Sequence, residues 1–123
     1  MNTLNVLGSP LLPCSYAPLT GFMRDGCCHA ISGDVGEHLV CVRVTPGFLN
    51  HQLELGNDLI TPRPELRFRG LKPGDRWCVC AVRWLQACSA GFPATVVLES
   101  THADALKSVS LALLRSHALT PVS

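Results

Sequence analysis

Three short runs of apolar and β-branched residues predict the strands of a sheet. They cover residues 38–44, 77–82 and 95–99. Valine and threonine favour extended chain because their branched side chains pack well on a pleated surface. Residues 4–7 form a weaker apolar run, for which we predict a short edge strand.

A helix signal follows the first run directly. Thr45 before Pro46 is typical of a helix start, because threonine caps free backbone amides and proline fits the first turn. Gly56 is typical of a helix end. We therefore predict a helix from Pro46 to about Leu55, with Phe48, Leu49 and Leu53 on the buried face.

Further helix signals lie in the second half of the chain. Residues 83–90 have helical composition and end at Gly91, so the second and third strands are joined by a helical crossover rather than a hairpin. The pattern Thr101 to Asp104 predicts a capped short helix, and Ser110 is the predicted cap of another that reaches His117.

Alternating strands and helices define the expected fold class. We predict one domain over residues 1–123, an α+β two-layer sandwich in which helices cover mainly one face of a mixed sheet of three to five strands. Residues 8–36 are rich in glycine, proline and serine, and predict a long ordered loop. Residues 72–75, Lys-Pro-Gly-Asp, fit a type II turn.

Charge excludes some classes of partner. The 123 residues carry ten basic and nine acidic side chains, scattered along the chain, for a formal charge of +1. A nucleic-acid or anionic membrane surface needs a concentrated basic patch. We therefore expect neither nucleic acid nor membrane as a partner.

The seven cysteines and the first residues of the chain indicate the expected cellular compartment. Residues 1–23 contain several polar residues and prolines and begin without a basic region, so we expect no export or membrane segment there. An odd number of cysteines in such a chain favours reduced thiols. The expectation is a soluble, cytoplasmic protein.

Several longer motifs resemble a known family. They are the cysteine-containing stretch 14–28, Gly36-x-His-x-Val-Cys41, residues 56–65, residues 70–84 and Thr101-His102. With these motifs the chain, from Leu4 to about Ala118, resembles a bacterial family of small uncharacterised proteins, domain of unknown function family twenty-two thirty-seven. The resemblance implies a two-layer α-β fold. It implies no activity, cofactor or catalytic residue.

Metal binding by the cysteines lacks the strong sequence sign, which is two closely spaced ligand pairs such as Cys-x-x-Cys. The chain instead has adjacent cysteines at 27 and 28 and a Cys-x-Cys pair in a predicted strand. We predict no cofactor. Zinc is the one metal left open, with ligands drawn from the cysteines Cys14, Cys27, Cys28, Cys78 and Cys80.

Thiol chemistry is a second hypothesis. A reactive cysteine is partly exposed and lies in electropositive surroundings. Cys27 and Cys28 lie in a predicted loop next to Arg24 and are the better nucleophile candidates, with His102 at a predicted strand end as a candidate base. The catalytic residues of such an enzyme are otherwise unknown. The alternative is that these cysteines are buried, or lie in the loop without a chemical role.

A group of polar residues in turns and at element ends gives the leading hypothesis. The candidate ligand-binding residues are Arg24, Asp25, Asn57, Asp58, Arg63, Asp75 and Arg76. Arginine forks suit carboxylate or phosphate groups. The internal alternative is that the aspartates accept loop amides and the arginines pair with them.

We therefore expect a small binding or accessory domain that recognises a small anionic ligand or a protein partner. The alternatives are a thiol- or metal-dependent enzyme that uses Cys27 or Cys28, and a purely structural subunit. The sequence alone fixes neither the ligand nor the oligomeric state.

Overall fold

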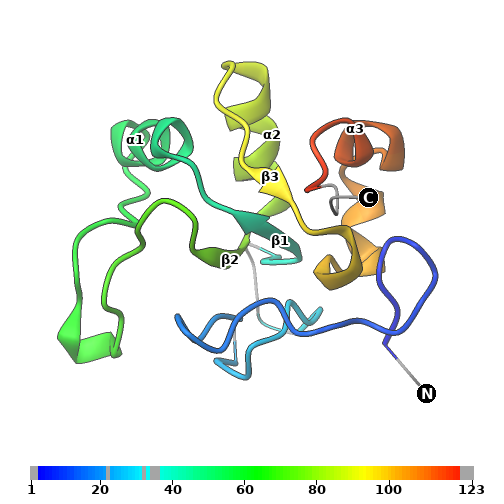
Figure 1. Cartoon of the computed structure of the whole chain (residues 1–123), viewed down its shortest axis with the longest axis horizontal. Helices are drawn as coiled ribbons and strands as arrows, with labels where there is room; N and C mark the ends of the chain where they lie inside the picture. The colour runs from blue at the N-terminus through cyan, green and yellow to red at the C-terminus, as the bar shows by residue number, and fades with distance from the viewer. Residues whose placement is uncertain (1–2, 22, 32, 34–36, 120–123) are drawn as a thin grey trace.

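A computed structural model describes residues 3–21, 23–31, 33 and 37–119. In this part, three α-helices accompany a three-stranded sheet, an α+β fold as predicted (Figure 1). The elements are β1 (Val40–Arg43), α1 (Pro46–Glu54), β2 (Arg76–Val79), α2 (Ala81–Ser89), β3 (Thr95–Val96) and α3 (Leu111–Ser116), with 3-10 turns at Pro64–Leu66, Leu98–Ser100 and Ala103–Lys107. None of the described helices combines the length and the apolar character that a membrane crossing requires.

The sheet has the order β2-β1-β3, with β1 in the centre. β1 is antiparallel to both neighbours; Cys41 faces Cys78 on one side and Val42 faces Val96 on the other. β2 and β3 therefore run in the same direction, and α2 forms the predicted crossover between them. The prediction of a mixed sheet is wrong for these strands, because β1 lies between the two parallel strands and keeps them from pairing.

Two predicted strands end earlier than expected. β2 stops at Val79 because α2 begins at Ala81. From there the buried residues Ala81, Trp84 and Ala87 follow the spacing of a helix, and not the two-residue alternation of a strand. β3 has two residues, and a 3-10 turn follows it. The predicted edge strand at 4–7 is also wrong: Leu4 and Asn5 form only isolated bridges.

The first helix follows its local signals. The Thr45 Oγ1 atom accepts a hydrogen bond from Phe48 N at 3.1 Å, the helix ends at Glu54, and Gly56 has a φ of +85°. The side-chain prediction is wrong at one position: Leu53 is 46% exposed, whereas Gln52 is fully buried. Gln52 can occupy the buried side because its Oε1 atom accepts a hydrogen bond from the Asn57 side chain.

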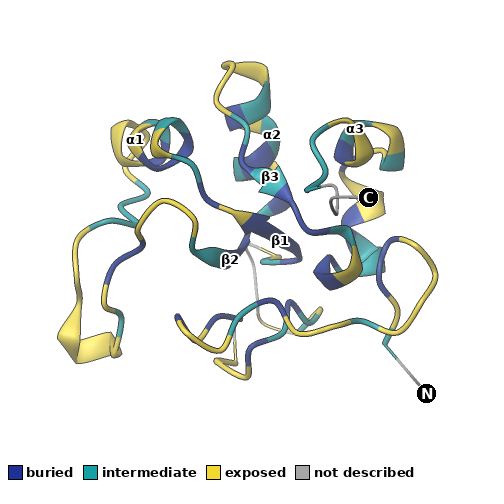
Figure 2. Ribbon diagram, in the orientation of Figure 1, coloured by how far each residue is buried: buried dark blue, intermediate teal, exposed yellow. Residues whose placement is uncertain are grey.

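The two faces of the sheet are covered by different parts of the chain. The three α-helices lie on one side, and the N-terminal segment passes along the other (Figures 1 and 2). We use the name N-terminal segment for residues 3–31, of which residue 22 is not described. Residues 22, 32 and 34–36 of the predicted loop 8–36 lie outside the described residues, so that prediction is not tested over its length.

Each face of the sheet has its own apolar cluster. On the helical side, Val40 and Val42 pack in the main core with Trp84, whose indole N–H donates to the Ala94 carbonyl at 3.0 Å. The second cluster comprises Cys14, Cys28, Cys41, Cys78 and Val97. Strand alternation explains the division, because Val40 and Val42 point to one face and Cys41 to the other.

Two helix caps were predicted in the C-terminal part, and the structure confirms one of these predictions and contradicts the other. Ser110 Oγ accepts from Leu113 N at 3.1 Å, as predicted. Thr101 is not the cap of the preceding turn; it is fully buried, donates to the Val97 carbonyl and accepts from Cys41 N. The cap is His102, whose Nδ1 accepts from Asp104 N at 2.9 Å.

The Thr101 hydroxyl links β1 to the C-terminal part, which generates a first prediction. Thr101→Val removes both hydrogen bonds with little change in shape and leaves two buried backbone groups without a side-chain partner. We expect the free energy of unfolding in urea to fall by about 1–3 kcal/mol. Thr101→Ser keeps the hydroxyl and is the matched control. A Thr101→Val protein as stable as the wild type would contradict this role.

The cap at His102 generates a second prediction. Burial lowers the pKa of His102 below its usual value; Asp104 opposes this effect, while His29 and Lys107 add to it. The unfolded chain binds the proton near pH 6.5. It therefore binds more protons than the folded chain between about pH 6.5 and the folded pKa, and the folded state loses stability as the pH falls through this interval.

His102→Asn tests this pH dependence, because asparagine is a good cap that does not titrate. The difference in unfolding free energy between wild type and His102→Asn, measured in urea at a series of pH values, is expected to change between about pH 7 and pH 5 in the direction of a less stable wild type. A constant difference over this interval would show that the titration of His102 is not linked to folding.

Candidate anion-binding pocket

A pocket of about 390 Å³ lies beside β2, on the side of the N-terminal segment. Four parts of the chain line it: the N-terminal segment with Arg24, His38 shortly before β1, the stretch of residues 58–68, and the middle of β2. We call it the arginine pocket. It is lined by Thr20, Gly21, Arg24, His38, Asp58, Leu59, Arg63, Leu66, Phe68, Trp77 and Cys78.

Arg24 is held at the pocket by its backbone and by an aromatic ring. Its φ of +55° is left-handed, and its N–H donates to the Gly21 carbonyl at 3.0 Å. Its guanidinium carbon lies 5.0 Å from the centroid of the Trp77 ring, within cation–π range. Gly21 also has a positive φ, and a Cβ there would collide with the Cys27 carbonyl oxygen. The turn therefore requires glycine at 21 and carries a strained residue at 24.

Arg63 reaches the same pocket from the stretch after α1. Its backbone exchanges two hydrogen bonds with Phe68, at 2.7 and 3.1 Å, and these close a short loop around Pro64–Leu66. The Phe68 ring packs against Trp77 with the ring centroids 5.2 Å apart. The two arginines, 39 positions apart in the sequence, thus line one pocket together with Phe68 and Trp77.

Asp58 is the carboxylate of the arginine pocket, and its own loop occupies it. One carboxylate oxygen accepts from Ile60 N at 2.9 Å and from Thr61 N at 3.0 Å. Hydrogen bonds from the Thr61 side chain, the largest cause, and from these two amides lower the pKa of Asp58, and Arg63 lowers it further. Asp58 is therefore ionised near neutral pH and serves mainly to shape the loop.

The other two candidate aspartates are also used internally. Asp25 accepts from Cys27 N at 3.0 Å and lies 3.4 Å from His29 Nε2. Asp75 accepts from Lys72 N at 2.9 Å in the predicted turn and pairs with Arg69 at 3.2 Å. Neither lines the arginine pocket.

The candidate arginines behave differently from the aspartates. Within the described part of the chain, neither Arg24 nor Arg63 forms an ion pair with a carboxylate. Arg76 lies opposite Arg43 in the β1–β2 register and does not line the pocket. The structure thus brings Arg24, Asp58 and Arg63 together and leaves Arg76 apart from them.

A second pocket, of about 240 Å³, adjoins the first. It shares His38, Leu59, Trp77 and Cys78 with the arginine pocket. Its own residues include Asn57, Cys80 and Arg83, and the Asn57 side chain also donates to Gln52. Sequence reasoning did not identify His38 as part of a site, because the residue lies in a predicted strand and far in the sequence from the turns that contain the other candidates.

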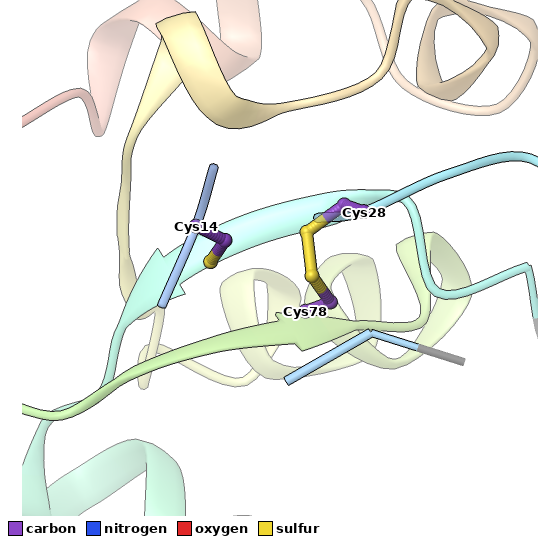
Figure 3. Close-up of side chains that lie close together, drawn as sticks. All are labelled: Cys14, Cys28 and Cys78. Atoms are coloured by element: carbon purple, nitrogen blue, oxygen red, sulfur yellow. A yellow bond between two sulfur atoms is a disulfide. The ribbon is translucent and has the colours of Figure 1, made fainter. Parts of the chain in front are cut away.

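Four of the seven cysteines form disulfides. Cys14 is bonded to Cys41 and Cys28 to Cys78, with the bond between Cys28 and Cys78 shown beside Cys14 in Figure 3. The expectation of reduced thiols is therefore wrong for these four. The partners are 27 and 50 positions apart, so their pairing depends on how the N-terminal segment crosses the sheet, which no local pattern indicates.

The nucleophile candidates lie in less reactive surroundings than expected. Cys28 is bonded to Cys78 and fully buried. Cys27 is a free thiol, but burial, and then the charge of Asp25, raise its pKa and disfavour the thiolate. The Nδ1 atom of His102 accepts the capping hydrogen bond already described. Within the described residues, Cys28 therefore offers no free thiol and the thiolate of Cys27 is disfavoured, although His29 lies within 4.8 Å of Cys27 and His117 Nε2 lies 3.4 Å from the free thiol of Cys88.

The comparison with known families agrees with this fold and these motifs. The model of a family described as an uncharacterized protein conserved in bacteria, DUF2237, matches residues 4–118. No curated protein matches the chain. The match extends over nearly the whole sequence and confirms the resemblance inferred from the motifs. The chain belongs to the DUF2237 family of uncharacterised proteins conserved in bacteria.

Proposed function

We propose that the protein is a small binding domain that recognises a small anionic ligand in the arginine pocket. The single observation that carries the proposal is the convergence of Arg24 and Arg63, neither of which is ion-paired within the described residues. The internal alternative predicts aspartates that accept loop amides and arginines that pair with them. Loop amides do occupy Asp25, Asp58 and Asp75, and Arg69 pairs with Asp75. The argument for a ligand is that Arg24 and Arg63 have no such carboxylate partner within the described residues.

The chemistry of the pocket favours a carboxylate or a phosphate. A guanidinium presents a planar fork of N–H donors that matches two oxygens of such a group. Since Arg24 lies with its carbon over the Trp77 ring, its N–H edges stay available for a ligand. Two arginines and one ionised aspartate, Asp58, line the pocket, so these side chains leave it an excess of positive charge.

The rest of the lining supports a ligand with an apolar body. Leu59, Leu66 and Phe68 line the pocket together with Trp77. A volume of about 390 Å³ lies within the range of small-molecule sites, which combine apolar walls with a few polar groups. The proposed ligand is therefore a small organic anion with a flat or aliphatic portion against these side chains.

Isothermal titration calorimetry with a panel of organic carboxylates and phosphates tests the proposal. For any anion that binds, Arg24→Gln and Arg63→Gln are each expected to weaken the affinity about 10- to 100-fold, the value of a hydrogen-bonded charge pair. Arg63→Lys keeps the charge without the fork and is expected to recover part of the loss. Arg115→Gln, in the last turn of α3, makes the same charge change away from the pocket and is the control.

The outcome against the proposal is equally definite. If no anion of the panel binds at millimolar concentration, or if Arg24→Gln, Arg63→Gln and Arg115→Gln all bind alike, the arginine pocket is not an anion site. Thermal unfolding of each variant shows whether a loss of affinity reflects the pocket or a loss of the fold.

A further inference from the structure

The two disulfides place four sulfur atoms at one buried position. Figure 3 shows Cys14, Cys28 and Cys78, whose sulfur atoms all lie within 4.8 Å of one another. Cys41 is bonded to Cys14. All four residues are at most 4% exposed. Four sulfurs from four separate parts of the chain therefore meet in the second apolar cluster.

The backbone explains why the sulfurs converge. Cys41 and Cys78 are directly opposite in the β1–β2 register, so their side chains share one face of the sheet. Both disulfides run from the sheet to the N-terminal segment, and neither joins the two strands to each other.

Contacts that involve no sulfur also position the N-terminal segment. Thr20 Oγ1 accepts from Cys78 N at 2.8 Å, and Leu12 N donates to the Glu99 carbonyl at 3.0 Å. Within the N-terminal segment, Cys14 N donates to the Gly26 carbonyl at 2.7 Å. This hydrogen bond brings the backbone around Cys14 close to the backbone just before Cys28. These bonds involve no sulfur, so they favour the same placement of the four cysteines after reduction, even where the segment opens more often without its cross-links.

We propose that the reduced chain binds one Zn²⁺ ion through Cys14, Cys28, Cys41 and Cys78. Zinc in structural sites is tetrahedral with Zn–S distances of about 2.3 Å, which places its sulfur ligands about 3.8 Å apart. The Cys14 sulfur needs to approach those of Cys28 and Cys78 by no more than about 1 Å from the limit of 4.8 Å to reach this spacing. On reduction, the sulfurs of each former disulfide separate from about 2 Å to the same spacing. The site is distinct from the anion-binding function and does not depend on it.

Zinc binding requires that both disulfides are first reduced. A phosphine reductant supplies two electrons to each disulfide and becomes a phosphine oxide with oxygen from water, and each disulfide yields two thiols. Zn²⁺ then binds the four sulfurs as thiolates and releases four protons, leaving a centre with a net charge of −2. Positive charge lies close by, because Cys78 also lines the pocket that contains Arg24 and Arg63. Such surroundings favour thiolates.

The free cysteines supply a matched control. Cys27, Cys80 and Cys88 are outside the disulfides, and Cys27 forms a separate, more exposed group with Asp25 and His29 that could also attract a metal. The triple variant Cys27→Ser, Cys80→Ser, Cys88→Ser keeps only the four cluster cysteines. Adding Cys28→Ser to this background then removes one proposed ligand.

The experiment is a Co²⁺ titration of the untagged triple variant, reduced with a phosphine under anaerobic conditions. We expect the visible and sulfur charge-transfer bands of tetrahedral tetrathiolate Co²⁺ at one ion per chain, followed by displacement with one equivalent of Zn²⁺. Cys28→Ser is expected to remove these bands and to weaken Zn²⁺ binding by more than the roughly 10- to 100-fold that changes outside the ligand shell cause. The oxidised triple variant is expected to give no such spectrum.

Several results would overturn the proposal. They are a reduced triple variant that binds no Co²⁺ at micromolar concentration, a spectrum that Cys28→Ser leaves unchanged, and metal binding by the wild type that the triple variant loses. Circular dichroism covers the case in which the reduced, metal-free chain unfolds: recovery of the fold with one equivalent of Zn²⁺ supports the site, and failure to recover it counts against it.

Discussion

Two covalent links fasten the N-terminal segment to β1 and β2, and the arginine pocket depends on this attachment. Arg24 lies in the stretch between Cys14 and Cys28, so one wall of the pocket belongs to a segment without regular helices or strands in its described part. Closing loops of 27 and 50 residues stabilises the folded state by about 3.5 and 4 kcal/mol in the chain-entropy account. The hydroxyls of Thr20 and Thr101 add hydrogen bonds from the backbone amides of Cys78 and Cys41.

The positive charge of the pocket follows from the way its loops are built. Turns need acceptors for their backbone amides, and Asp25, Asp58 and Asp75 each fill that need. The carboxylates are thereby tied to fixed positions, while Arg24 and Arg63 keep their N–H groups for other partners. The anion binding that we propose therefore depends on acidic residues that shape the loops and on basic residues that line the pocket.

Local signals predicted the helices better than the strands. The cap at Thr45, the end at Gly56 and the cap at Ser110 each depend on residues within one turn, and the structure confirms them. Leu53 was predicted to be buried but is exposed. Gln52 lies on the buried side of α1 in its place, where it accepts a hydrogen bond from the Asn57 side chain. Thr101 was misread as a cap because its partners, Val97 and Cys41, are set by the sheet.

The site was predicted in part for the same reason. Loop position and residue type identified Arg24, Asp58 and Arg63, but the exclusion of Arg76 and the inclusion of His38 depend on tertiary geometry. Disulfide pairing is likewise decided by the path of the N-terminal segment across the sheet. Spacing alone gave no sign of it.

Amide hydrogen exchange on the oxidised protein and on the reduced protein with a zinc chelator tests the central claim most directly. The account predicts that reduction lowers protection at Cys78 and across residues 14–28 by a factor of at least about 100, while the amides of α1 and α2 keep theirs. Equal protection of residues 14–28 in both states would show that the cross-links do not hold the pocket wall in place.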